Sequence, residues 1–186
     1  APPFDFLTGS FLPLVERLGA RVQCRLERPG FYPAGGGRFE ASIEPVGSLG
    51  RLELMERGPI VSHRARALVS RLPAEIAERE LAGVRRRFGW GEEACVVETV
   101  SNALGTGNAL LLEAKTDTMT YVFSGMGERG RTAEDVAGGV CEAYQSWWDA
   151  NVPVDESLAD QLLLPMALGQ GGQFRTVKPS QHTVTN

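Results

Sequence analysis

The order of strand-like and helix-like segments is the sequence feature that most restricts the fold. Between residues 58 and 151 the pattern runs strand, helix, three strands, helix, and Gly58-Pro59 breaks regular structure at its beginning. A helix and three strands precede this stretch, and a helix and one strand follow it. The sequence therefore predicts an α+β protein. A smaller α/β insert domain at 58–151 interrupts a unit formed by 1–57 and 152–186, whose two parts then have to meet in space.

Hydrophobic periodicity gives the expected bounds of each element. Apolar residues at three- and four-residue steps predict helices at 4–18, 73–88, 132–151 and 155–168. Alternating or short apolar runs between turn residues predict strands at 20–27, 38–46, 51–55, 60–69, 94–100, 109–114, 119–124 and 173–177. Pro13 lies inside the first helix, where a proline can bend the chain. Thr132 with Asp135 three residues later is close to a capping box.

The helix predicted at 155–168 has a polar beginning and a dense apolar remainder. Asp155 is a good N-cap, and apolar residues that include Leu164 and Leu168 predict a mostly buried helix. Asp160 and Gln161 interrupt the apolar surface. They are either the solvated start of a buried helix or part of a functional site, and spacing alone does not decide between the two.

A polar segment, KPSQHTVTN, ends the chain and contains His182, one of only two histidines. The sequence predicts a loop here. Imidazole can act as an acid, a base, a ligand or a nucleophile, but a single histidine in a polar loop is often only a surface residue. The other histidine, His63, lies within a predicted strand and is interpreted as a structural or surface residue. Tyr144 and either Trp147 or Trp148 are interpreted as packing residues of the long helix and not as base-stacking residues.

Composition excludes some classes of protein. The chain has 186 residues with 42% hydrophobic and 23% charged residues, which is typical of a folded globular protein. A net charge of −4 means that any RNA contact has to be local. The three cysteines, Cys24, Cys95 and Cys141, form no C-x-x-C motif, which favours a reducing, cytoplasmic location and no zinc site. No apolar run is long enough to predict a membrane span.

A glycine-rich segment, RPGFYPAGGG (28–37), separates two predicted strands. Such a segment can cradle phosphate through its backbone N–H groups. It can equally be a hairpin loop that needs positive φ angles at glycine. It lacks the Lys-Ser/Thr pair of a P-loop and does not precede a helix, so a nucleoside-triphosphate P-loop is not expected.

Three segments together resemble one enzyme family. VDESLADQLLLPMAL followed by KPSQHTVTN, the glycine-rich segment 28–37, and APPFDFL at the start are similar to sequences of the RNA 3'-terminal phosphate cyclases, in the family's order. The resemblance implies the C-terminal portion of such an enzyme. The expected fold is then the third βαβαββ-like repeat of the cyclase domain with its smaller α/β insert.

The same resemblance implies an activity and its residues. These enzymes use ATP and Mg²⁺ (or Mn²⁺) to convert an RNA 3'-phosphate end to a 2',3'-cyclic phosphate. His182 matches the family's adenylylated histidine. The ATP site is expected to include the side chains or backbone of Pro3, Ser157, Leu158, Ala159, Asp160 and Gln161. No residue is assigned as a metal ligand, and RNA 3'-phosphate ends and ATP are the expected partners, with no membrane partner.

The chain departs from the family at one of these positions. Members often carry a tyrosine where this chain has Ser157, and serine cannot stack on adenine. Two other functions are compatible with the resemblance. One is a non-catalytic protein of RNA processing or ribosome assembly with the same fold, against which His182 argues. The other is a fragment that is inactive without the two N-terminal repeats. The oligomeric state, the physiological RNA and the role of the insert do not follow from the sequence.

Overall fold

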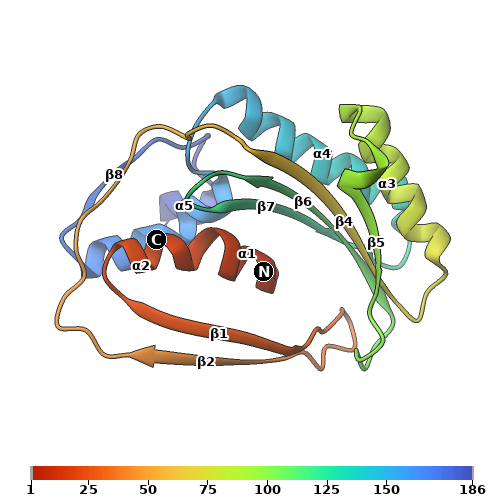
Figure 1. The fold of residues 1–186 in the computed structure, drawn as a ribbon, viewed down its shortest axis with the longest axis horizontal. Coiled ribbons are helices and arrows are strands. Elements are labelled where there is room, and N and C mark those ends of the chain that lie inside the picture. Colours follow the sequence, from red (N-terminus) through yellow and green to blue (C-terminus); the bar gives the residue numbers. More distant parts are fainter. Residues whose placement is uncertain (1, 186) are drawn as a thin grey trace.

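The computed structural model describes residues 2–185, so Ala1 and Asn186, the outermost residues of the predicted flanking unit, lie outside the described part. The fold is a mixed α+β structure (Figure 1). Its helical segments are α1 (Phe4–Phe6), η1 (Leu7–Phe11), α2 (Leu12–Arg17), α3 (Ala74–Phe88), η2 (Glu92–Ala94), α4 (Ala133–Ala150), α5 (Glu156–Leu168) and α6 (Gln181–Thr185). Its strands are β1 (Arg21–Arg28), β2 (Arg38–Glu44), β3 (Leu52–Leu54), β4 (Ser62–Ser70), β5 (Cys95–Thr99), β6 (Gly107–Lys115), β7 (Thr120–Met126) and β8 (Gly172–Phe174).

A four-stranded sheet in the order β5-β4-β6-β7 forms the centre of the molecule. Helices α3 and α4 cover one face, and the helical run α1–η1–α2 lies on the other (Figure 1). Successive side chains of a strand point to opposite faces, so β4 contributes to both sides of the sheet. In β4, Ala65, Ala67 and Val69 are buried in the core, while Arg66 and Leu68 line a pocket on the opposite side. The predicted strand and helix order of residues 58–151 is confirmed.

The first helix differs from the regular helix expected at 4–18, because its middle turn is a π-helix. The Leu12 N–H donates to the Leu7 carbonyl, five residues earlier, in η1. Pro13 has no N–H to offer the carbonyl four residues before it, and a widened turn accommodates that loss. The predicted perturbation near Pro13 is thus a π segment.

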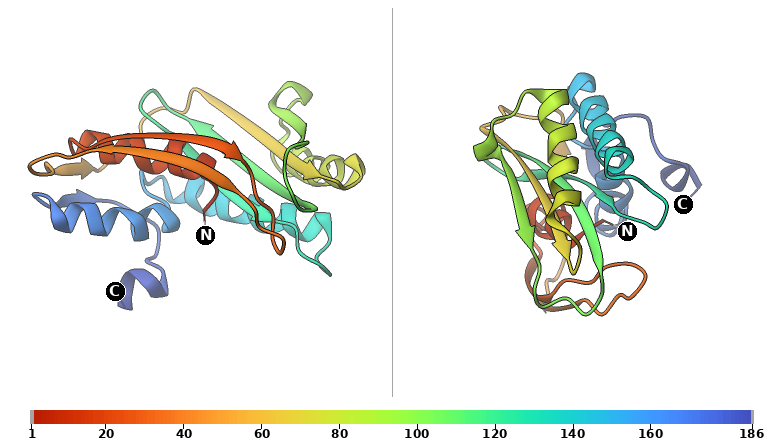
Figure 2. Two further views of the ribbon diagram at one scale, coloured as in Figure 1. Left: turned by 90° about the horizontal axis from the view of Figure 1, so that it is seen from below. Right: turned by 90° about the vertical axis from the view of Figure 1, so that its right-hand side faces the viewer.

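Strands β1 and β2 form an antiparallel hairpin with Leu26 opposite Phe39. Val22 and Cys24 are half-buried, as the alternation predicts. On β2, however, Phe39 is 53% exposed and Ile43 is 69% exposed. The hairpin forms a sheet of its own (Figures 1 and 2), and Phe39 and Ile43 lie on the same face of it as Leu26 and Val22, their partners in register.

The segments that flank residues 58–151 meet in space. Strands β3 and β8 pair in parallel, with Leu52 opposite Gly172, and the Arg175 N–H donates to the Leu54 carbonyl at 3.0 Å. One hydrophobic core includes residues of both parts, among them Leu14 and Trp147. The division into two domains at these boundaries stays a prediction.

Helices α4 and α5 begin where the sequence predicts. Thr132 Oγ1 accepts from the Asp135 N–H at 3.1 Å and Asp135 Oδ2 accepts from the Thr132 N–H at 3.2 Å, which confirms the capping box. The expectation that α5 is mostly buried is wrong at its C-terminal end, where Leu164 is 67% exposed and Leu168 is 72% exposed. Helix α5 packs through one face only, and these two side chains lie outside that face.

His63 and the three aromatic residues of α4 have the packing roles that the sequence indicates. Tyr144 and Trp147 are buried, and the Tyr144 hydroxyl lies 2.6 Å from His63 Nδ1. The Arg57 guanidinium lies over the rings of Trp147 and Trp148, at 4.6 and 4.5 Å from their centroids. Burial and the charge of Arg57 lower the pKa of His63. This cluster joins the strand β4 side of the sheet to the end of α4.

The described chain contains no helix with the length and hydropathy of a membrane span. Cys24, Cys95 and Cys141 are all free thiols.

Candidate functional site

Asp155 fixes the beginning of α5. Its carboxylate oxygen Oδ1 accepts from the backbone N–H groups of Ser157 at 2.9 Å and Leu158 at 3.2 Å. Burial raises the pKa of Asp155 to about 6, although the two N–H groups act in the opposite direction. The capped first turn places Leu158 and Ala159 fully in the core, so their side chains are not accessible to a ligand. Ser157 and Gln161 are exposed.

Asp160 is the polar residue of α5 with the most informative contacts. Its Oδ1 accepts from the Ser180 hydroxyl at 2.7 Å and also from the Thr183 hydroxyl. These hydrogen bonds, followed by the charge of His182, lower the pKa of the Asp160 carboxyl. Asp160 therefore carries a negative charge that holds the segment containing His182 against α5.

The segment around His182 is a short helix and not the loop that the sequence predicts. Ser180 precedes α6, and its Oγ accepts from the Thr183 N–H at 3.0 Å, which caps the helix. The Val184 N–H donates to the Ser180 carbonyl at 3.2 Å. A five-residue helix is not stable alone, so the contact with Asp160 is the physical reason for its order. His182 is exposed on this helix.

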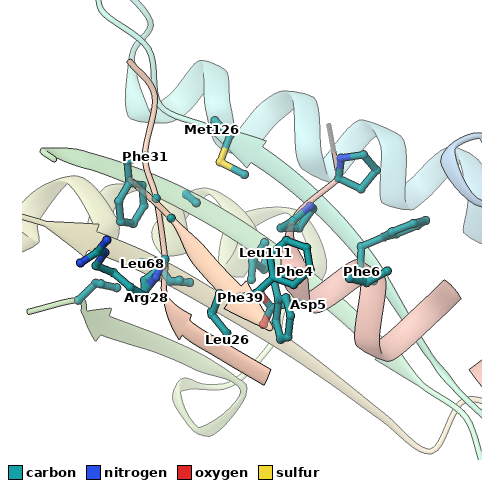
Figure 3. Close-up of a pocket in the computed structure, with 18 of the residues that line it drawn as sticks. Phe4, Asp5, Phe6, Leu26, Arg28, Phe31, Phe39, Leu68, Leu111 and Met126 are labelled. Carbon is teal, nitrogen blue, oxygen red and sulfur yellow. The ribbon is translucent and has the colours of Figure 1, made fainter. Parts of the chain in front are cut away.

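A pocket of about 1130 Å³ lies between the hairpin, the first helix and the central sheet (Figure 3). Pro3 and Gln161, which come from opposite ends of the sequence, both line it. Ser157 and His182 are not among its lining residues. The structure thus brings Pro3 and Gln161, two of the expected nucleotide contacts, together at one pocket. His182 lies outside this pocket on α6, the short helix held against α5.

Arg66 forms the charged floor of this pocket. Its guanidinium donates two hydrogen bonds to Glu98 at 2.7 and 2.8 Å, one to Asp5 at 2.5 Å and one to Glu113 at 2.9 Å. The bonds to Glu98, and then those to Glu113 and Asp5, raise the pKa of Arg66 although its burial opposes this. Because Asp5 belongs to the first turn of α1, Arg66 also fixes the chain next to Pro3.

The glycine-rich segment 28–37 forms the loop of the β1–β2 hairpin, which is one of the two interpretations of its sequence. Gly35 and Gly36 have φ angles of +64° and +76°, which L-residues with side chains rarely adopt. Gly30 is packed so closely that an added Cβ would lie 2.5 Å from the Gly37 nitrogen. The phosphate-cradle interpretation stays a prediction.

The sequence did not indicate the aromatic lining of the pocket. Phe4 comes from α1, Phe31 and Tyr32 from the hairpin loop, and Phe39 from β2 (Figure 3 labels all but Tyr32). The signal was present in the sequence, since two aromatic residues interrupt the glycine-rich segment and a third follows it.

Residues 2–185 contain no group of three or more His, Cys, Asp or Glu side chains placed to hold one metal ion. Mg²⁺ bound with a nucleotide is usually held by its phosphates and one or two carboxylates, and the expected Mg²⁺ or Mn²⁺ stays a prediction.

Comparison with known proteins gives one consistent result. The family described as RNA 3'-terminal phosphate cyclase matches residues 1–186. Proteins named RNA 3'-terminal phosphate cyclase from Koribacter versatilis (strain Ellin345) and Ectopseudomonas mendocina (strain ymp) are 42% and 44% identical over 186 residues. A protein of the same name from Ralstonia nicotianae is 44% identical over 187 residues. Each comparison covers the whole of this chain, but only 52%, 54% and 53% of the length of the respective relative. The chain thus spans about half the length of the curated relatives it matches.

Proposed function

Because the chain belongs to the RNA 3'-terminal phosphate cyclase family, we propose that it supplies the nucleophile and part of the nucleotide site of such an enzyme. The reaction is the ATP-dependent conversion of an RNA 3'-phosphate end to a 2',3'-cyclic phosphate. The observation that carries the proposal is the family match over the whole chain. The placement of His182 on a helix that Asp160 holds next to the predicted ATP site is consistent with it.

In the first step, a ring nitrogen of neutral His182 attacks the α-phosphate of ATP. A nitrogen–phosphorus bond forms, the bond to the β-phosphate oxygen breaks, and pyrophosphate leaves. The histidine–AMP intermediate divides one difficult phosphoryl transfer into easier steps. His182 is exposed, so its ring is accessible to a nucleotide that occupies the adjoining surface.

In the second step, an oxygen of the RNA 3'-phosphate attacks the same phosphorus and displaces His182, which gives an RNA–adenylate. The neighbouring 2'-hydroxyl then attacks the terminal RNA phosphate and loses its proton, and AMP leaves. Each step exchanges one phosphorus bond for another, and positioned donors and a divalent cation would stabilise the developing charge.

The predicted nucleotide contacts receive different roles in this proposal. Pro3 and Gln161 line the pocket and are the candidates for contact with the base. Ser157 is exposed at the first turn of α5 and can offer a hydroxyl but no stacking surface. Leu158 and Ala159 support this turn from the core. Asp160 keeps α6 in place, and direct contact between Asp160 and the nucleotide stays a prediction.

The experiment is the intact mass of the chain after incubation with ATP and Mg²⁺. An acid-labile gain of one AMP that is lost in His182→Ala supports the proposal. Gln181→Ala is the matched control, because Gln181 is also an exposed residue of α6 and should keep the label. A gain that persists in His182→Ala contradicts the role of this histidine. No gain in the chain, with labelling of a full-length relative, means that the part of the family protein outside this chain is needed. No gain in either supports the non-catalytic RNA-processing or ribosome-assembly alternative.

A further inference from the structure

The pocket is larger than one nucleotide base requires. Pockets that hold drug-sized ligands measure about 300 to 1000 Å³, and this one measures about 1130 Å³. Pro3 and Gln161 occupy the side formed by α1 and α5, and the hairpin forms the rest. A nucleotide bound at Pro3 and Gln161 therefore leaves the hairpin side of the pocket without an occupant.

The hairpin side combines exposed aromatic rings with a basic side chain. Tyr32 is 75% exposed and Phe39 is 53% exposed, and both line the pocket. Arg28 donates from Nε to the Gly36 carbonyl at 2.7 Å and forms no ion pair with the residues that the structure describes. Arg38, by contrast, is paired with Glu27 at 2.8 Å. Arg28 is thus the basic group of the hairpin that remains available to an anion.

Aromatic rings next to one available arginine fit single-stranded nucleic acid. Bases stack on aromatic side chains without regard to sequence, while arginine contacts the phosphates. The floor of the pocket does not suit phosphate, because Asp5, Glu98 and Glu113 surround Arg66 there. The polynucleotide backbone is therefore expected along the rim near Arg28, with the bases directed inward.

We propose that the hairpin side of the pocket binds the last nucleotides of single-stranded RNA, with Tyr32 and Phe39 stacking on bases and Arg28 contacting a phosphate. The inference rests on the proposed function. The proposed RNA site lies in a pocket that Gln161 also lines. Gln161 follows Asp160 on α5, and Asp160 holds the helix that carries His182. The pocket thus borders α5, the helix against which Asp160 holds the segment of His182.

The test is the fluorescence anisotropy of a labelled single-stranded RNA with a 3'-phosphate, titrated with the chain. Stacking contributes enough per base that Phe39→Ala and Tyr32→Ala should each raise the dissociation constant about 5- to 150-fold. Ile43→Ala is the matched control, because Ile43 is an exposed apolar residue of the same strand, 69% exposed against 53% for Phe39, and does not line the pocket. Phe39→Trp should retain binding. Arg28→Gln should reduce the salt dependence of binding by about 0.7 in log–log slope.

The outcomes separate this inference from the proposed function. Equal affinities for Phe39→Ala and Ile43→Ala, or no RNA binding by a chain that takes AMP on His182, overturn the RNA site. RNA binding that depends on Phe39 and Tyr32 in a chain that takes no AMP supports the RNA site independently of AMP transfer to His182. If RNA does not bind and both Phe39→Ala and Ile43→Ala abolish self-association in sedimentation, the surface is a protein contact and the inference is wrong. Tyr32 is the most exposed of these side chains, so Tyr32→Ala should fold normally and its loss of RNA binding would not be caused by misfolding.

Discussion

Asp160 is expected to control the position of His182 through the docking of α6. Its carboxylate accepts hydrogen bonds from Ser180 and Thr183, and these are the side-chain hydrogen bonds that join α5 to α6 among the described residues. A hydrogen bond to a charged group contributes about 1.5 to 3 kcal/mol. Because Asp160 is partly exposed, water can replace part of these hydrogen bonds when they break. We therefore assign about 1.5 kcal/mol to the two hydrogen bonds together. Asp160→Ala should therefore lower the docking equilibrium of α6 about tenfold.

Amide hydrogen exchange measures this change directly. The N–H groups of Thr183 and Val184 donate within the cap that Ser180 forms, so their protection reports whether α6 is folded and docked. Their protection should fall about tenfold in Asp160→Ala, and adenylylation of His182 should slow by up to the same factor. Protection in the core of α5 should not change. Glu156→Gln is the control, since Glu156 is an exposed acidic residue of the same helix.

Two further measurements separate a positioning role from direct nucleotide contact. Asp160→Asn keeps an acceptor oxygen but loses the charge, so it should give an intermediate loss of protection. The folded state lowers the pKa of Asp160, so docking is favoured above the ordinary pKa of an aspartate and is lost as the pH falls through the lowered value. Unchanged protection at Thr183 and Val184 in Asp160→Ala would refute the reasoning. Unchanged protection together with a raised KM for ATP would assign Asp160 to the nucleotide instead.

Two other perturbations test the packing of the sheet against α3 and α4. Glu80 is fully buried on α3 and its pKa is raised to about 7 by burial, so its protonated form stabilises the fold below about pH 4.5 and this contribution is lost as the pH rises to about 7. Glu80→Gln should raise the free energy of unfolding at pH 8 by on the order of 3 kcal/mol in urea titrations and have little effect at pH 4.5, whereas the exposed Glu78→Gln should change neither. Arg57→Ala removes the cation that lies over Trp147 and Trp148 and should lower the free energy of unfolding by about 1 to 2 kcal/mol, with a change in tryptophan fluorescence.

The sequence predicts most of the regular elements because their signals are local. Strand β4 alternates small apolar residues with polar ones, and α4 begins with a capping box, so neither needs information from elsewhere in the chain. Helix α6 could not be found in this way. It is five residues long, and its order depends on Asp160, which lies on another helix. Tertiary contacts outweigh local propensity in segments of this length.

Local sequence signals also fail for some apolar residues, which are exposed in the structure although their hydrophobic character is typical of a core. Leu168 on α5 and Ile43 on β2 carry the hydrophobic character of core positions, and the sequence predicts the first to be buried. Hydrophobic periodicity identifies the apolar face of a helix or strand. It does not show whether another element packs on that face, because that depends on the tertiary fold. Within residues 2–185 nothing covers either side chain.

The pocket explains why only part of the candidate site followed from the sequence. Pro3 and Gln161 were identified because each lies in a segment that resembles the family, and the structure places both on one pocket. Phe39 and Tyr32 lie in or beside the glycine-rich segment, where the notable feature was the absence of side chains. Their importance depends on the hairpin folding over the face of the sheet that carries Arg66, a contact between segments far apart in the chain. If the RNA titrations succeed, the glycines of this segment serve to shape a loop that presents aromatic rings, and the phosphate-cradle interpretation is not needed.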